Sequence, residues 1–230
     1  SENINYDLSK AWAVIDSAIE NKIFPGGQIF ISKSGAIIAS ESFGNHTYDK
    51  NSPLTTNESI YDIASLTKIL ATTPTIMKLV QKKQIGLNYP LSDFYPEFLE
   101  GKKKNITIEH LLTHTAGLRS YVEFYKMEGY NNRENIIDYI INQDLEYEPG
   151  TKVIYSDLGM ILLFDIIEKV TNTTLSKLSK RYFYNPLKMK NSFFNPASNI
   201  KSNIAPTEYD QHFRNRMLQG EVHDKNAYIY

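Results

Sequence analysis

The 230-residue sequence contains no cysteine. This absence excludes disulfides, thiolate metal sites and a cysteine nucleophile, and it leaves the redox compartment open. The net charge of −1 gives no electrostatic reason to expect nucleic acid as a partner, and the one basic run, Lys102-Lys103-Lys104, is interpreted as a solvated loop. No apolar run is long enough to span a bilayer. The first residues, Ser1-Glu2-Asn3, show no signal-peptide pattern, so we expect a chain trimmed from a longer secreted precursor.

The glycines also lack the spacings of several catalytic motifs. No G-x-G pair is present, which excludes a dinucleotide-binding fingerprint, and neither a Walker loop nor a G-x-S-x-G elbow occurs. His110 and His114 have the i, i+4 spacing of a zinc site, but Leu111 stands where the zincins have a catalytic glutamate. We therefore predict no metal and no cofactor, and expect His114 to hydrogen-bond locally and brace the following turn.

Hydrophobic periodicity predicts an α/β chain. A helix over 8–21 is followed by a β-hairpin, Gln28–Ser32 and Ala36–Phe43, and then by a mostly helical block. Further helices are predicted at 65–84 (with a kink at Pro74), 106–113, 133–143, 158–170 and 174–184, whereas 45–58, 88–104 and 185–219 are predicted to be irregular. A lone hairpin is too small to be stable, so its sheet needs further strands, and we expect them after Tyr230.

Ser65-Leu66-Thr67-Lys68 fits the pattern S-x-x-K. Chance alone supplies such a match in a chain of this composition, and a second one occurs at Ser198 and Lys201 in a polar stretch. Ser65 differs because it opens a long apolar helix, where unpaired amides favour a serine alkoxide. Lys68 lies one turn on, within reach of the hydroxyl, and the helix field and burial should lower its pKa. The alternative is that Ser65 only caps the helix.

Three further segments give the chain a family resemblance. Tyr155-Ser156-Asp157 resembles the Y-S-N or Y-A-N element of class C β-lactamases, family VIII esterases and D,D-peptidases. Ile106–Leu118 is similar to the "LLTHTSGL" segment, and Gly220–Ala227 is similar to the "GxVHDxNA" run of that penicillin-binding-protein superfamily. The resemblance implies an antiparallel sheet flanked by helices, begun in 1–60, and a helical subdomain in 61–230. The resemblance further implies that the remaining strands of the α/β domain are not in this chain.

The resemblance also implies a mechanism and a site. Ser65 would attack a carbonyl, Lys68 and Tyr155 would together move the proton, and the Ser65 amide would supply half of an oxyanion hole. Asp157 stands at a substrate-binding position where the family has asparagine. An ionised Asp157 near Lys68 would keep the lysine protonated, whereas a neutral or outward-facing one would not. The chain ends before the "KTG" or "HxG" element, so we expect it to be impaired on its own.

The implied function is hydrolysis, through an acyl-enzyme, of a small ester, a D-amino-acid amide or peptide, or a β-lactam. The substrate would be a small molecule or derived from peptidoglycan, the location extracytoplasmic or periplasmic, and a neighbouring domain of a longer precursor a further partner. One alternative is a non-catalytic module that binds peptidoglycan peptides or a partner domain. A rival Ser-His-Asp arrangement would use His223 and Asp224, although adjacent side chains usually point apart.

Overall fold

A computed structural model describes residues 6–230, so the expectation about Ser1-Glu2-Asn3 lies outside the described residues. The chain forms two compact units. The hairpin unit consists of the residues up to Asp62 together with Asn195–His223, and the helical unit consists of Ile63–Phe194 together with Asp224–Tyr230.

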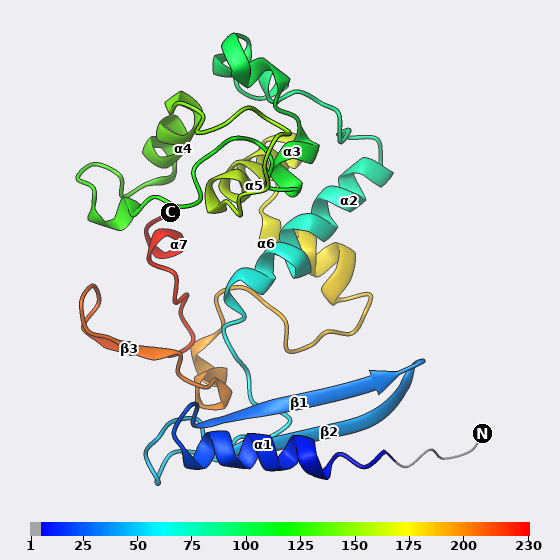
Figure 1. Ribbon diagram of the computed structural model, residues 1–230, viewed down its shortest axis with the longest axis vertical. Helices are drawn as coiled ribbons and strands as arrows, with labels where there is room; N and C mark the ends of the chain where they lie inside the picture. The colour runs from blue at the N-terminus through cyan, green and yellow to red at the C-terminus, as the bar shows by residue number, and fades with distance from the viewer. Residues whose placement is uncertain (1–5) are drawn as a thin grey trace. The chain divides into compact units, whose positions relative to one another are not determined.

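The hairpin unit opens with the predicted helix and hairpin, which are both confirmed. Helix α1 (Ser9–Glu20) precedes strands β1 (Gly26–Lys33) and β2 (Ala36–Gly44), which pair antiparallel. The connecting Ser34 and Gly35 both have positive φ, 51° and 80°, as a tight turn between two twisted strands requires. Helix α1 runs along the hairpin, where the rings of Trp12 and Phe43 lie 5.4 Å apart (Figure 1).

A second hairpin lies in the stretch 185–219, and the prediction that this stretch is irregular is therefore wrong. A 3₁₀ turn, η8 (Ser198–Asn203), is followed by strands β3 (Glu208–Asp210) and β4 (Arg216–Leu218), which pair antiparallel. Strands of three residues are too short to show alternation in a sequence. An enclosed ion pair links the end of β3 to the loop instead: Arg214 Nε lies 2.9 Å from Asp210 Oδ2, and both side chains are almost fully enclosed.

The helical unit contains the other elements, connected in the order of the chain (Figure 1). They are the 3₁₀ turns η1 (Ala64–Leu66), η3 (Leu91–Asp93), η4 (Pro96–Phe98), η5 (Gly101–Asn105) and η6 (Phe124–Lys126), the π-helical turns η2 (Lys68–Thr72) and η7 (Lys180–Tyr184), and the α-helices α2 (Thr73–Gln81), α3 (Ile108–Leu112), α4 (Arg133–Asn142), α5 (Asp157–Thr171), α6 (Leu175–Ser179) and α7 (Lys225–Ile229).

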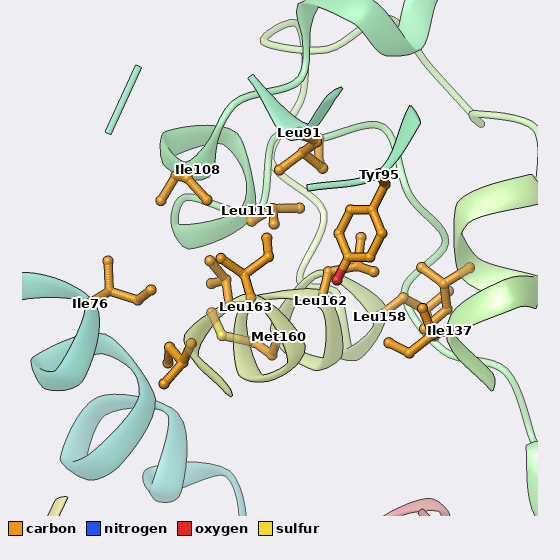
Figure 2. Close-up of a cluster of buried hydrophobic side chains, with 14 of the residues drawn as sticks. Ile76, Leu91, Tyr95, Ile108, Leu111, Ile137, Leu158, Met160, Leu162 and Leu163 are labelled. Atoms are coloured by element: carbon orange, nitrogen blue, oxygen red, sulfur yellow. The ribbon is translucent and has the colours of Figure 1, made fainter. Parts of the chain in front are cut away.

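Helix α5 is the centre of the core, as its nearly uninterrupted apolar sequence predicts. Figure 2 shows Leu158, Leu162 and Leu163 of α5 beside side chains of α3 and of the segment that contains η3. All three leucines are completely buried, and each such side chain contributes about 1.5–3 kcal/mol relative to exposure. The helix that begins at Asp157, directly after Tyr155 and Ser156, is therefore packed firmly into the core.

The prediction of an irregular loop over 88–104 is wrong in detail, because η3, η4 and the start of η5 lie in this segment. Leu91 and Phe98 are completely buried there, so these turns close one side of the core. The basic run is also only partly solvated: Lys102 and Lys104 are exposed, but Lys103 Nζ donates to the carbonyl of Ile141 at 2.8 Å. Single buried residues between turns leave no helical or alternating pattern to detect.

The predicted helix 65–84 is divided into three pieces: η1, the π turn η2 and helix α2, whose first turn holds Pro74. Proline has no N–H, so the carbonyl of Leu70, four residues earlier, loses its helical donor. The hydroxyl of Tyr184 donates to this carbonyl at 3.3 Å. This donor belongs to a residue 114 positions further along the chain, and the irregularity of the predicted helix takes the form of a π turn.

Among the described residues, no helix combines the length and the apolar character that a membrane crossing requires.

Candidate active site

Ser65 lies in the 3₁₀ turn η1, directly after a residue in an uncommon backbone conformation. Ala64 has φ 45°, in the left-handed region that costs a non-glycine residue about 1 kcal/mol or more. The Ser65 side chain is exposed, and its hydroxyl accepts a hydrogen bond from Lys68 Nζ at 3.0 Å. None of η1, η2 and α2 has a side-chain cap at its N-terminus. The structure therefore gives no support to the capping alternative for Ser65.

Lys68 lies at the meeting point of the predicted site residues. Its Nζ lies 2.8 Å from Asp157 Oδ1 and 5.0 Å from the centre of the Tyr155 ring, in addition to its contact with Ser65. The Lys68 side chain is 18% exposed and that of Asp157 30%. One cation therefore touches the hydroxyl, the carboxylate and the aromatic face.

The pKa of Lys68 is raised, which corrects the prediction that it is lowered. Burial of the ammonium alone lowers this pKa, as the sequence suggested, but hydrogen bonding to Asp157 and Tyr155 and the charge of Asp157 outweigh burial. The sequence left two orientations of Asp157 open. The structure has the carboxylate facing Lys68, so the ammonium form is favoured.

The start of α5 holds the Tyr155-Ser156-Asp157 segment in place. Ser156 is almost completely buried; its hydroxyl donates to the carbonyl of Arg119 at 2.6 Å and accepts from the amide of Gly159 at 3.3 Å as the N-cap of α5. The amide of Asp157 donates to the carbonyl of Ser120 at 2.9 Å. Asp157 thus begins the helix, where the helix dipole favours a carboxylate.

His114 is a residue of this site that sequence reasoning missed. Its ring lies 4.7 Å from that of Tyr155, centre to centre, and its Nδ1 accepts a hydrogen bond from the amide of Ser156 at 3.1 Å. Burial, followed by the charge of Lys68, lowers the pKa of His114. The expected local hydrogen bond that braces the following turn is not what the ring makes: its Nδ1 contacts the Tyr155-Ser156-Asp157 segment, 42 residues further along the chain. The position of His114 in the "LLTHTSGL"-like run was the available signal.

A cavity of about 420 Å³ opens beside these groups. Ser65, Lys68, Thr73, His114 and Tyr155 supply its polar lining, and apolar side chains that include Leu112 and Met160 form the rest. Tyr155 is about half exposed, so its phenol is accessible to a bound molecule. Polar groups that converge in a largely apolar cavity are typical of small-molecule sites.

The other candidate residues have different partners. His223 Nε2 lies 2.9 Å from Glu208 Oε1, while Asp224 Oδ1 accepts the amide of Ala227 at 2.7 Å and caps α7. The His223 and Asp224 side chains are therefore engaged separately, which contradicts the Ser-His-Asp arrangement. His110 Nδ1 accepts the amide of Thr107 at 3.1 Å and caps α3. In the part of the chain that the structure describes, no group of three or more His, Asp or Glu side chains is arranged to hold a metal.

The fold and the site together define a class of protein. The mixture of an antiparallel sheet with many helices is the β-lactamase and transpeptidase type of α/β fold, as the sequence resemblance predicted. A family model described as Beta-lactamase matches residues 13–228. The chain therefore belongs to the beta-lactamase family, and the resemblance to the serine β-lactamase and penicillin-binding-protein superfamily is confirmed.

Individual relatives agree with this assignment. The chain is 29% identical over 250 residues to an N-acetylmuramyl-L-alanine amidase of Bacillus subtilis, and 29% identical over 260 residues to a protein of Salmonella agona named as a putative D-alanyl-D-alanine carboxypeptidase. These alignments cover 93% and 99% of this chain but 56% and 60% of the relatives.

Among solved structures, the octameric penicillin-binding-protein homologue from Pyrococcus abyssi is similar, with a TM-score of 0.76 and 26% identity, over 94% of this chain and 51% of that one. The chain thus spans between half and three fifths of the length of these relatives.

Proposed function

We propose that Ser65 is the nucleophile of a serine hydrolase that works through an acyl-enzyme. The observation that carries this proposal is the convergence on Lys68: its Nζ contacts Ser65 Oγ at 3.0 Å and Asp157 Oδ1 at 2.8 Å, beside the ring of Tyr155. A serine hydroxyl needs a neighbouring group to take its proton, and the groups here lie within reach in a cavity that admits a substrate.

In the proposed reaction, Ser65 Oγ attacks the substrate carbonyl while its proton passes to the Lys68–Tyr155 pair. The tetrahedral oxyanion is stabilised in part by the Ser65 amide. The carbonyl re-forms, the bond to the leaving group breaks, and the leaving group takes a proton from the pair. Water, activated by Tyr155, then attacks the ester of Ser65, releases the acid and restores the hydroxyl.

The raised pKa of Lys68 sets a condition on this scheme. An ammonium donates to Ser65 Oγ but cannot accept its proton, so the Lys68–Tyr155 pair has to lose one proton before it acts as a base. Asp157 opposes that loss through its negative charge. The proposed enzyme is therefore slow near neutral pH and becomes faster as the pH rises.

The proposed substrates are small esters, D-amino-acid amides or peptides, and β-lactams. The names of the two relatives support a peptidoglycan-derived substrate, and with it an extracytoplasmic location. The apolar part of the cavity wall suits the hydrocarbon portion of such an acyl group.

The alternative is a binding module without turnover, which recognises peptidoglycan peptides or a partner domain. The specific observation in its favour is the ion pair of Lys68 with Asp157, because a lysine fixed as a cation binds a carboxylate but does not accept a proton. Such a module would bind acidic peptides at this cavity and would not form a covalent bond to Ser65.

Covalent labelling separates the two functions. The protein is treated with a fluorescent penicillin and, separately, with a fluorophosphonate, and the adduct is located by peptide mass spectrometry. We expect labelling of Ser65 that is lost in Ser65→Ala and in Lys68→Ala. Ser198→Ala is the matched control, because Ser198 and Lys201 repeat the S-x-x-K spacing without the site. Failure of both reagents to modify Ser65, in protein that is folded, would favour the binding module.

A further inference from the structure

His114 holds the residue before and the residue after Tyr155 at the same time. Its carbonyl accepts the amide of Ile154 at 2.9 Å, and its ring Nδ1 accepts the amide of Ser156 at 3.1 Å. Between these two bonds its ring packs against the phenol ring of Tyr155. A single residue therefore fixes the backbone on both sides of the tyrosine and one face of its side chain.

His114 makes these two hydrogen bonds and this ring contact from an uncommon backbone conformation. Its φ is 57°, in the left-handed region, where a residue other than glycine is uncommon. The hydroxyl of Tyr147 also donates to the His114 carbonyl, at 3.3 Å. A strained residue that is held by several partners next to a reactive group indicates a role in function.

The hydrogen bond to Ser156 N–H depends on the protonation state of the imidazole. Nδ1 accepts only when it carries no proton, so the ring in this structure is neutral with its proton on Nε2. A protonated ring would have a donor at Nδ1 facing another donor, and the Ser156 amide would lose its partner. Ser156 is buried, so no water replaces that partner without a rearrangement.

We infer that His114 is a positioning residue for Tyr155 and Asp157, and that it performs this role only as a neutral imidazole. The inference rests on the proposed function for its effect on rate, but the hydrogen bond itself is independent of any reaction. When His114 takes up a proton, the Ser156 amide is released and the start of α5 shifts, which moves Tyr155 and Asp157 away from Lys68.

The charged and titratable groups around His114 set the pH at which this happens. Lys68 faces it with a positive charge and Asp157 with a negative one, while the Tyr155 ring packs against its imidazole and the Tyr147 hydroxyl donates to its carbonyl. Burial and Lys68 together hold the pKa of His114 below its ordinary value of 6.5. The site should therefore stay assembled at neutral pH and come apart only in acid.

Two amide substitutions of equal charge test the inference. In His114→Asn the side-chain oxygen occupies the place of Nδ1 and accepts from the Ser156 amide at any pH. In His114→Gln the amide occupies the place of Nε2 and leaves the Ser156 N–H unpaired. Asparagine also tolerates positive φ, so the thermal unfolding of both variants is measured to separate loss of the fold from loss of position.

The rate of Ser65 labelling by a fluorophosphonate is then followed from pH 4.5 to 8. We expect His114→Asn to label within about threefold of the wild type at pH 8 and His114→Gln to label about 10- to 100-fold more slowly, because a displacement of about 1 Å can cost that much. Below pH 6 the wild type should lose activity more steeply than His114→Asn. Equal rates for the two variants, or an equal acid limb in His114→Asn and wild type, would overturn the inference.

Nuclear magnetic resonance distinguishes a failure of this inference from a failure of the proposed function. The amide resonance of Ser156 should titrate together with the His114 ring in the wild type and should not titrate in His114→Asn, whether or not Ser65 reacts. A Ser156 amide that is unchanged while the ring takes up its proton would refute the positioning role. If the Ser156 amide titrates as expected but Ser65 does not react, the proposed function fails and the hydrogen bond stands.

Discussion

Replacing Asp157 by asparagine should make Ser65 react faster near neutral pH, although it removes a charge from the active site. Asparagine has nearly the same shape as aspartate and lacks its negative charge. The ion pair of Asp157 Oδ1 with Lys68 Nζ, at 2.8 Å, is then lost, and with it the largest influence that raises the pKa of Lys68. The Lys68–Tyr155 pair should lose its proton at a lower pH.

The exposure of the Lys68 and Asp157 side chains sets the size of the energy that their ion pair contributes. Lys68 is 18% exposed and Asp157 30%, so the pair lies between a surface ion pair and a buried one. Exposed pairs contribute up to about 1 kcal/mol and hydrogen bonds to charged groups about 1.5–3 kcal/mol, so we take about 1–2 kcal/mol for this one. Since 1.36 kcal/mol corresponds to a tenfold change, the deprotonated fraction at a given pH should rise about 5- to 30-fold.

The assay is the second-order rate constant for phosphonylation of Ser65, measured by intact mass spectrometry between pH 6 and 10. The Asp157→Asn profile should lie at lower pH than the wild-type profile and should meet it in strong alkali, where Lys68 is neutral in both. Glu148→Gln is a matched control, because it removes one negative charge that pairs with Lys102 instead. An Asp157→Asn profile that is lower at every pH, or that rises at the same pH as the wild type, would refute the reasoning.

Two further predictions concern the helical unit. Tyr184→Phe removes the hydroxyl that donates to the carbonyl of Leu70 and should lower the free energy of unfolding by about 1–3 kcal/mol, measured by guanidinium denaturation. The loss should be smaller in a Pro74→Ala background, because alanine restores a backbone N–H. Equal losses in both backgrounds would contradict this explanation of the Tyr184 contact. Asp165→Asn should lower the free energy of unfolding by about 2–4 kcal/mol. The buried carboxylate accepts two hydrogen bonds from Arg133, at 3.0 and 2.7 Å, and without its charge the Arg133 guanidinium loses part of its ion pairing.

The pKa of Asp165 fixes the direction in which the stability difference between wild type and Asp165→Asn changes with pH. Burial alone raises the pKa of Asp165, but the hydrogen bonds from Tyr95, Arg133 and Lys169 outweigh burial and lower it. The carboxylate therefore contributes stability that is fully present above about pH 4 and is lost as the pH falls through its lowered folded-state pKa. The stability of Asp165→Asn should decline less between pH 5 and 2 than that of the wild type, and parallel declines would show that other carboxylates dominate.

Much of the backbone could be predicted because its signals are local. The first hairpin has a turn glycine between two regular strands, and α5 has an apolar sequence that only a buried helix explains. The second hairpin contains the enclosed Asp210–Arg214 pair, which joins the last residue of one very short strand to the loop before the next. Strands of three residues give no hydrophobic periodicity, so the second hairpin could not be predicted from the sequence.

In the candidate site, too, local contacts could be predicted from the sequence, but the protonation of Lys68 could not. The spacing of Ser65 and Lys68 could be read as one turn of a helix, and the atoms lie within hydrogen-bonding distance. The sequence could not rank burial against the charge of Asp157, because that ranking depends on a contact across residues far apart in the chain, and the predicted direction of the Lys68 pKa was wrong for this reason. The i, i+4 spacing of His110 and His114 likewise suggested a shared face, whereas the positive φ of His114 takes it out of the helix.

The π turn η2 has a consequence for the number of residues that this part of the chain tolerates. A π turn is closed by i→i+5 hydrogen bonds and holds one residue more than the i→i+4 turn of an α-helix, so removing a single residue between Lys68 and Thr72 should convert η2 into an ordinary α-helical turn that continues into α2. Natural variation in this segment should therefore include the loss of one residue, with an α-helical turn in place of η2.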